Sequence, residues 1–83
     1  MWECILVTAS WCKACVPMKE YWGRCERSGV EFKIIDAEEL PKELLHICSL
    51  PTVVIRYNGE TVVEENGVKT MEQIMETLKQ AGA

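Results

Sequence analysis

Two cysteines separated by two residues, Cys12 and Cys15, are the side chains of this sequence with the clearest chemical potential. Thiols at this spacing can close into a disulfide and reopen, which transfers two electrons. The same spacing occurs in zinc sites, so the pair alone leaves both chemistries open. An apolar run at residues 5–7 precedes the pair and a helix-like stretch follows it. We therefore expect the two thiols where a strand turns into a helix, a position that favours redox chemistry.

The elements that would hold this pair form a strand–helix–strand unit. Residues 3–8 are apolar enough for a buried strand, and Ser10 is a candidate N-cap for the helix that follows. Gly29 is suited to end that helix, and residues 30–36 have a strand pattern. Such a unit is right-handed with parallel strands. The core-facing residues of the helix fall at i, i+3, i+4 and i+7: Met18, Tyr21, Trp22 and Cys25.

The middle of the chain predicts a second helix and then a hairpin. The helix has two candidate starts, because Asp36 has capping-box spacing and Pro41 suits a first helical position. Both starts remain open at this point. The pair Asn58-Gly59 lies between β-rich runs at residues 53–57 and 60–64. Asn-Gly in this context specifies an antiparallel hairpin with a type I′ turn.

A last helix completes the predicted order β-α-β-α-β-β-α. Thr70 and Gln73 have capping-box spacing at its start. The sequence thus predicts an α/β fold with a four-stranded mixed sheet flanked by three helices. At 83 residues, we expect one domain over residues 1–83.

Composition narrows the partners and the location. The net charge is −4 and the basic residues are scattered, which argues against a nucleic-acid partner. No apolar run reaches the roughly 20 residues of a membrane span, and residues 1–7 lack the basic start and long apolar stretch of a secretory leader. We expect a cytoplasmic monomer that binds no membrane. Five cysteines cannot all pair within one chain, so Cys4, Cys25 and Cys48 are interpreted as small buried hydrophobic residues.

Cys12 is the candidate nucleophile. At a helix N-terminus, free N–H groups favour its thiolate, and Lys13 adds a nearby cation. Cys15 lies one turn further and would be more buried, which suits a resolving thiol. Trp11 offers an apolar platform beside the nucleophile for a substrate polypeptide.

Three segments in this order resemble the thioredoxin/glutaredoxin superfamily in its minimal, glutaredoxin-sized form. They are Trp11-Cys12-Lys13-Ala14-Cys15, Leu50-Pro51-Thr52, and Tyr57-Asn58-Gly59-Glu60 followed by Gly67. The resemblance implies a thioredoxin-like fold with a cis Leu50-Pro51 peptide opposite the dithiol. It implies a dithiol–disulfide oxidoreductase whose redox-active disulfide, Cys12-Cys15, is its only cofactor, with no metal. Its expected partners are protein disulfide substrates and, as electron donor, a thioredoxin-reductase-like flavoprotein or glutathione. The substrate-binding residues would be Trp11, Lys13, Ala14, Leu50, Pro51 and Gly67.

The sequence departs from that resemblance at informative places. Lys13-Ala14 replaces the Gly-Pro that thioredoxins usually carry between the cysteines. Leu6 and Phe32 stand where a thioredoxin buries an acid and its partner lysine, and no replacement is evident. Most of the glutathione-binding signature of glutaredoxins is also missing. The alternatives are a glutathione-coupled glutaredoxin, a metal or iron–sulfur site, and a non-catalytic thioredoxin-like partner subunit.

Overall fold

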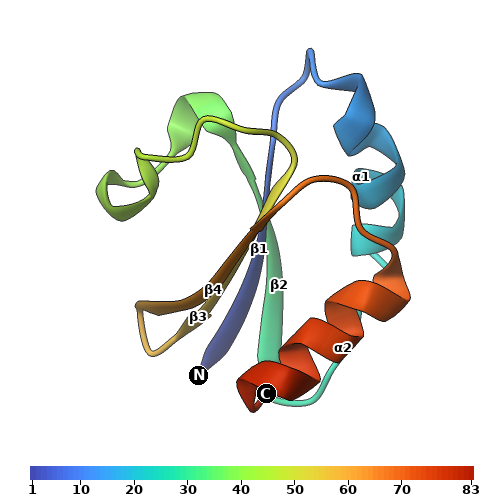
Figure 1. Cartoon of the computed structure of the whole chain (residues 1–83), viewed down its shortest axis with the longest axis vertical. Helices are drawn as coiled ribbons and strands as arrows, with labels where there is room; N and C mark the ends of the chain where they lie inside the picture. The colour runs from blue at the N-terminus through green and yellow to red at the C-terminus, as the bar shows by residue number, and fades with distance from the viewer.

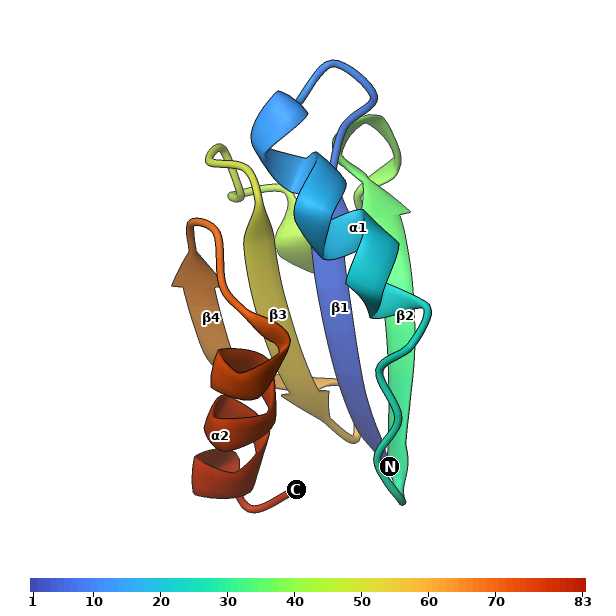
Figure 2. The same ribbon diagram turned by 90° about the vertical axis from the view of Figure 1, so that its right-hand side faces the viewer.

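A four-stranded mixed sheet forms the centre of the molecule. A computed structural model describes all residues of the chain, Met1–Ala83. The strand order is β2-β1-β3-β4. The first two strands in sequence are parallel, and the other neighbours are antiparallel, as Figure 2 shows. The predicted strand–helix–strand unit and mixed sheet are therefore confirmed. The strands are β1 (Trp2–Thr8), β2 (Val30–Asp36), β3 (Thr52–Tyr57) and β4 (Glu60–Asn66).

Two α-helices cover one face of this sheet, and irregular chain covers the other (Figure 1). The helices are α1 (Val16–Trp22) and α2 (Met71–Ala81). Alternate residues of β1 point to opposite faces, which divides the core into two clusters. The cluster under the helices contains Cys4, Leu6, Met18, Trp22, Val53, Ile55, Ile74 and Leu78. The cluster on the other face contains Ile5, Val7, Leu44 and Val54.

The predicted middle helix is absent as an α-helix. The segment between β2 and β3 contains two short 3-10 turns, Ala37–Glu39 and Lys42–Leu44. Both candidate starts are used, since Asp36 caps the first turn and Pro41 precedes the second. Pro41 keeps Leu40 extended (ψ 133°), and this separates the two turns. The sheet is thus flanked by two α-helices and these turns rather than by three helices.

The ends of α1 also differ from their prediction. Ser10 is not its N-cap, because a 3-10 turn at Lys13–Cys15 comes between the loop and the helix. Gly29 is not its C-terminal cap either, because the helix ends at Gly23. The chain then continues in tight turns, in which the N–H of Arg24 bonds to the carbonyl of Tyr21. Gly29 has a φ of +79° and forms the turn that enters β2.

The hairpin and the final helix follow their local signals. Asn58 and Gly59 have φ values of 51° and 85°, which a type I′ turn requires, and they join β3 to β4. Thr70 accepts a hydrogen bond from the Gln73 backbone, and the Gln73 side chain accepts one from the Thr70 backbone. The predicted hairpin and the predicted capping box are confirmed.

Thr70→Ala is expected to lower the free energy of unfolding by about 1 kcal/mol, because it removes one half of the capping box. For a domain of this size, that loss lowers the Tm by about 4–8 °C. Thermal unfolding followed by circular dichroism measures it. Gln80→Ala, at an exposed position near the end of the same helix, is the control and should change the Tm little. Equal Tm values for Thr70→Ala and the native chain would contradict the prediction.

The strand directions bring three loops to one end of the sheet. The pairing of Val7 with Thr52, and of Thr52 with Asn66, places the end of β1, the start of β3 and the end of β4 together. The loops that leave these positions contain the dithiol, the Leu50-Pro51 peptide and Gly67 (Figures 1 and 2). None of the helices is both long and apolar enough to cross a membrane.

Candidate active site

The two thiols of the motif are in direct contact. Cys12 precedes the 3-10 turn and Cys15 ends it, and the Cys12 N–H is held by the carbonyl of Ala9 at 3.1 Å. Both cysteines are free thiols, and the Cys15 thiol donates to the Cys12 sulfur with a Sγ–Sγ distance of 2.6 Å. Cys15 has no exposed surface, whereas Cys12 keeps 9% of its own. The structure therefore brings the predicted pair together, with Cys12 retaining a small exposed surface and Cys15 retaining none.

The surroundings of Cys15 keep this thiol protonated. Burial is the largest cause of its raised pKa, and the Cys12 sulfur raises the pKa further. The Thr8 side chain and the Ala9 backbone act in the opposite direction. A protonated Cys15 is the donor in the hydrogen bond to Cys12. The arrangement suits a thiol that reacts second.

The other three cysteines have different surroundings. Burial raises the pKa of Cys4 to about 12 and also raises that of Cys25, so both carry less of the reactive thiolate than an ordinary cysteine. Cys4 is fully buried and Cys25 half-buried, in agreement with their interpretation as small hydrophobic residues. Cys48 is exposed, so this interpretation is wrong for Cys48. In the same loop Ile47 and Leu50 are the residues that pack against the core, and Cys48 is left at the surface.

The loop that contains the predicted cis peptide lies against the dithiol. Leu50-Pro51 is cis, as the resemblance implied. Leu50 packs on the cluster formed by Ala9, Cys12 and Cys15, and the Gly67 N–H bonds to the Pro51 carbonyl at 2.9 Å. Leu50 is thus adjacent to the two thiols, and Pro51 and Gly67 are joined to each other beside it.

A buried threonine, which the sequence motif includes but to which no role was predicted, fixes this loop. Thr52 follows Pro51 and is fully buried. Its single hydroxyl proton is shared between two acceptors, the Ser49 carbonyl and Asn66 Oδ1, the latter 2.8 Å from the hydroxyl oxygen. These bonds tie the start of β3 to the end of β4. A threonine directly after the proline was the available signal, but its partner Asn66 is brought close only by the hairpin.

The remaining predicted site residues are exposed next to Cys12. Trp11 is 69% exposed, and Lys13 and Ala14 are also at the surface. Val16 and Val68 add exposed apolar side chains, one from the start of α1 and one from the segment after β4. Loops at this end of the sheet therefore expose apolar side chains, and Lys13 directly follows Cys12 in the chain.

The dithiol lacks a buried acid–lysine pair. Leu6 is fully buried in the core, and the ring of Phe32 packs edge-on against Trp22, with the centroids 5.8 Å apart. Strands β1 and β2 do carry an acid–lysine pair, Glu3 and Lys33, with Nζ and Oε2 2.6 Å apart. The hydrogen bond from Lys33 lowers the pKa of Glu3. That pair lies near the other end of β1 from the dithiol and cannot serve it.

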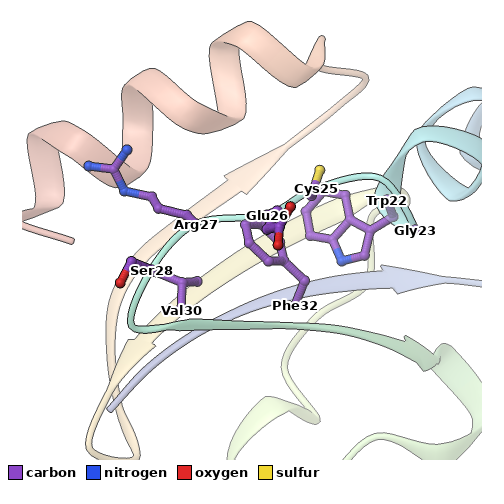
Figure 3. Close-up of a pocket in the computed structure, with 8 residues that line it drawn as sticks. All are labelled: Trp22, Gly23, Cys25, Glu26, Arg27, Ser28, Val30 and Phe32. Atoms are coloured by element: carbon purple, nitrogen blue, oxygen red, sulfur yellow. The ribbon is translucent and has the colours of Figure 1, made fainter.

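The largest hollow of the molecule is not at the thiols. An open groove of about 720 Å³ lies at the C-terminal end of α1, where Figure 3 shows Trp22, Cys25 and Phe32 along it. The guanidinium of Arg27, at the edge of the groove, already donates hydrogen bonds to the carbonyl of Ala83. The groove contains no activated nucleophile, since the pKa of Cys25 is raised. No group of three or more His, Cys, Asp or Glu side chains is placed to hold a metal ion.

Comparison with solved structures identifies the fold. No protein-family model matches the sequence, and no curated protein matches it. Among solved structures, the chain is similar to thioredoxin f from spinach chloroplasts, with 25% identity and a TM-score of 0.81 over 99% of this chain and 71% of that one. It is also similar to a mutant thioredoxin from Halobacterium salinarum, with 19% identity and a TM-score of 0.82 over 99% and 75% of the two chains. A third similar structure is the oxidised thioredoxin of Plasmodium falciparum, with 21% identity and a TM-score of 0.77 over 99% of this chain and 82% of that one.

These similarities extend over nearly the whole chain although the sequences have diverged widely. The order of elements, the mixed sheet, the dithiol at the β1–α1 junction and the cis-proline loop are all present in this structure. The chain therefore has the thioredoxin-like fold.

Proposed function

We propose that this protein is a dithiol–disulfide oxidoreductase that reduces disulfides of other proteins. The observation that carries the proposal is the contact between an accessible sulfur and a buried one, Cys12 and Cys15, beside a backbone loop fixed at Leu50-Pro51. Reduction of a disulfide by exchange needs an accessible attacking sulfur and a second thiol within reach. The similarity to thioredoxins supports a redox role of this kind.

In the first step the Cys12 thiolate attacks one sulfur of a substrate disulfide. A bond forms between Cys12 and that sulfur, the substrate S–S bond breaks, and the released thiolate takes a proton. In the second step Cys15 loses its proton and attacks the Cys12 sulfur. The Cys12–Cys15 bond forms, the mixed disulfide breaks, and the second substrate sulfur leaves as a thiol. The substrate gains two electrons and the protein dithiol loses them.

The exposed rim around Cys12 would hold the substrate. Trp11 supplies an apolar surface, and Lys13 and Ala14 lie between the cysteines. The loop residues Leu50 and Pro51 can offer backbone groups to an extended peptide, as in strand addition. Gly67 lies beside them, and a side chain there would meet Lys69 Nζ at 3.8 Å.

Reduction of insulin disulfides tests the proposal and identifies the electron donor. We expect turnover with NADPH and a thioredoxin-reductase-type flavoprotein, because the structure carries the dithiol and the cis-proline loop while the glutathione signature is missing. A parallel assay with glutathione and a small glutathione mixed disulfide tests the alternative. Equal or higher activity in that assay would make the protein a glutaredoxin. Absence of turnover with every donor, with Cys12 shown to be free, would refute the proposal.

A further inference from the structure

Thr8 is a polar residue at the end of a buried apolar strand. It is the last residue of β1, and Ile5, Leu6 and Val7 before it are apolar and buried. Because side chains of a strand alternate, Thr8 points to the same face as Cys4 and Leu6, which pack under α1. The start of that helix, just after Cys15, lies over the end of β1. Thr8 therefore lies at the end of β1 on the face of the sheet that α1 covers, the face on which Cys15 begins that helix.

The hydroxyl of Thr8 has no hydrogen-bond partner. Thr8 is 4% exposed, and its Oγ1 is buried without an acceptor or donor. A buried unpaired hydroxyl destabilises a fold, and valine would occupy the same volume without that cost. Packing and stability thus give no reason for a hydroxyl at this position.

The chemistry of Cys15 gives a reason for a hydroxyl at position 8. As a thiol, Cys15 directs its proton at Cys12 and leaves Thr8 without a role. As a thiolate it would be an acceptor in a buried place, and the Thr8 side chain is close enough to lower the Cys15 pKa. The groups that act on Cys15 are Cys12, Thr8 and the Ala9 backbone, of which Cys12 alone can titrate. No carboxylate or ammonium group acts on it.

We infer that the Thr8 hydroxyl donates a hydrogen bond to the Cys15 thiolate as this forms in the resolving step, in place of the buried acid that the site lacks. The inference rests on the proposed function. Thr8 keeps its own proton; the proton of Cys15 leaves through solvent and ends on the departing substrate thiol. The electron pair of the Cys15 thiolate forms the Cys12–Cys15 bond, and the Cys12–substrate bond breaks. Thr8 thus assists the second half of the reaction and has no part in the first.

The first test titrates Cys15 itself and needs no turnover. In a Cys12→Ser background, NMR of the cysteine Cβ carbons follows the ionisation of Cys15 with pH. Thr8→Val should move its midpoint up by about one pH unit, a tenfold loss of thiolate at a given pH. Thr8→Ser, which keeps the hydroxyl, should leave the midpoint in place. The inference would be overturned if the Cys15 midpoint were the same in Thr8→Val as in the chain that keeps Thr8. It would also be overturned if Thr8→Ser raised the midpoint as much as Thr8→Val.

The second test separates the two steps of exchange. With both cysteines present, Thr8→Val should slow the decay of the mixed disulfide about tenfold at neutral pH and leave its formation by Cys12 unchanged. The Tm of Thr8→Val should equal or exceed that of the native chain, because an unpaired buried hydroxyl is removed. Slowing of both steps together with a lower Tm would indicate a structural role and overturn the inference. Should the valine variant fail to fold, Thr8→Ala removes the same hydroxyl. Failure of the proposed function looks different: no insulin turnover in the native chain, with the titration shift intact.

Discussion

Replacing Cys12 by serine should reduce the turnover of a protein disulfide to the uncatalysed rate, a loss of about a thousandfold or more. The reason is chemical, because a serine hydroxyl can neither form a thiolate nor join a disulfide. The dithiol would lose its less buried sulfur, since Cys15 has no exposed surface. Insulin reduction with NADPH and a thioredoxin-reductase-type flavoprotein, the donor that we propose, measures the effect.

Cys48→Ser is the matched control for that variant. Cys48 is also a free cysteine and is more exposed than Cys12, but it lies outside the cluster that contains the dithiol. We expect Cys48→Ser to keep native turnover. Comparable losses in the two variants would mean that any exposed thiol of the chain suffices, and residual activity in Cys12→Ser would mean that Cys12 is not the nucleophile. A non-catalytic partner subunit would likewise keep its function without Cys12.

Replacing Cys15 by serine should also stop turnover, but at the second step of the exchange rather than at the first. Cys12 should still attack, but the mixed disulfide can no longer be resolved from within the chain. The variant should therefore accumulate as a covalent adduct with its substrate, one substrate per chain, and multiple turnover should stop. Mass spectrometry of the intact adduct, before and after a reducing agent, measures it.

Cys25→Ser serves as the control for the Cys15 variant. Both side chains are thiols whose pKa burial raises, but Cys25 lies on the groove at the far end of α1. Cys25→Ser should form no lasting adduct and should turn over normally. Normal turnover of Cys15→Ser without an added thiol would contradict the assignment of Cys15 as the resolving cysteine.

Where local signals decide the structure, the sequence was sufficient to predict it. Asn58-Gly59 specifies one turn type, and both φ values agree. Thr70 and Gln73 satisfy each other's backbone groups, so the start of α2 depends on nothing distant. The dithiol was predictable for the same reason, since its spacing and flanking elements lie within one short segment.

Where packing decides between weak signals, the sequence was not sufficient. The segment from Asp36 to Ser49 has two helix starts, and Pro41 separates them, so each start produces only one 3-10 turn. Neither turn gains enough hydrogen bonds to extend. The start of α1 was also misplaced, because the backbone first makes a tight turn that brings Cys15 against Cys12.

The two threonines around the dithiol show why a site is harder to predict than a motif. Thr52 acts through Asn66, which is close only once the hairpin has formed. In the sequence, nothing distinguishes Thr8 from other strand residues. Its hydroxyl is found to be buried and unpaired only in the folded chain. Both residues act through tertiary contacts, which a motif does not encode.

A redox titration in which each cysteine is assigned shows whether Cys12 and Cys15 form the redox-active pair. The protein is equilibrated over a range of dithiol/disulfide buffer ratios, its free thiols are alkylated, and each cysteine is quantified by peptide mass spectrometry. We predict that Cys12 and Cys15 become oxidised together, with a two-electron midpoint, while Cys4, Cys25 and Cys48 remain free thiols. The account would be contradicted if Cys12 and Cys15 stayed reduced over the whole range, or if either of them paired with another cysteine.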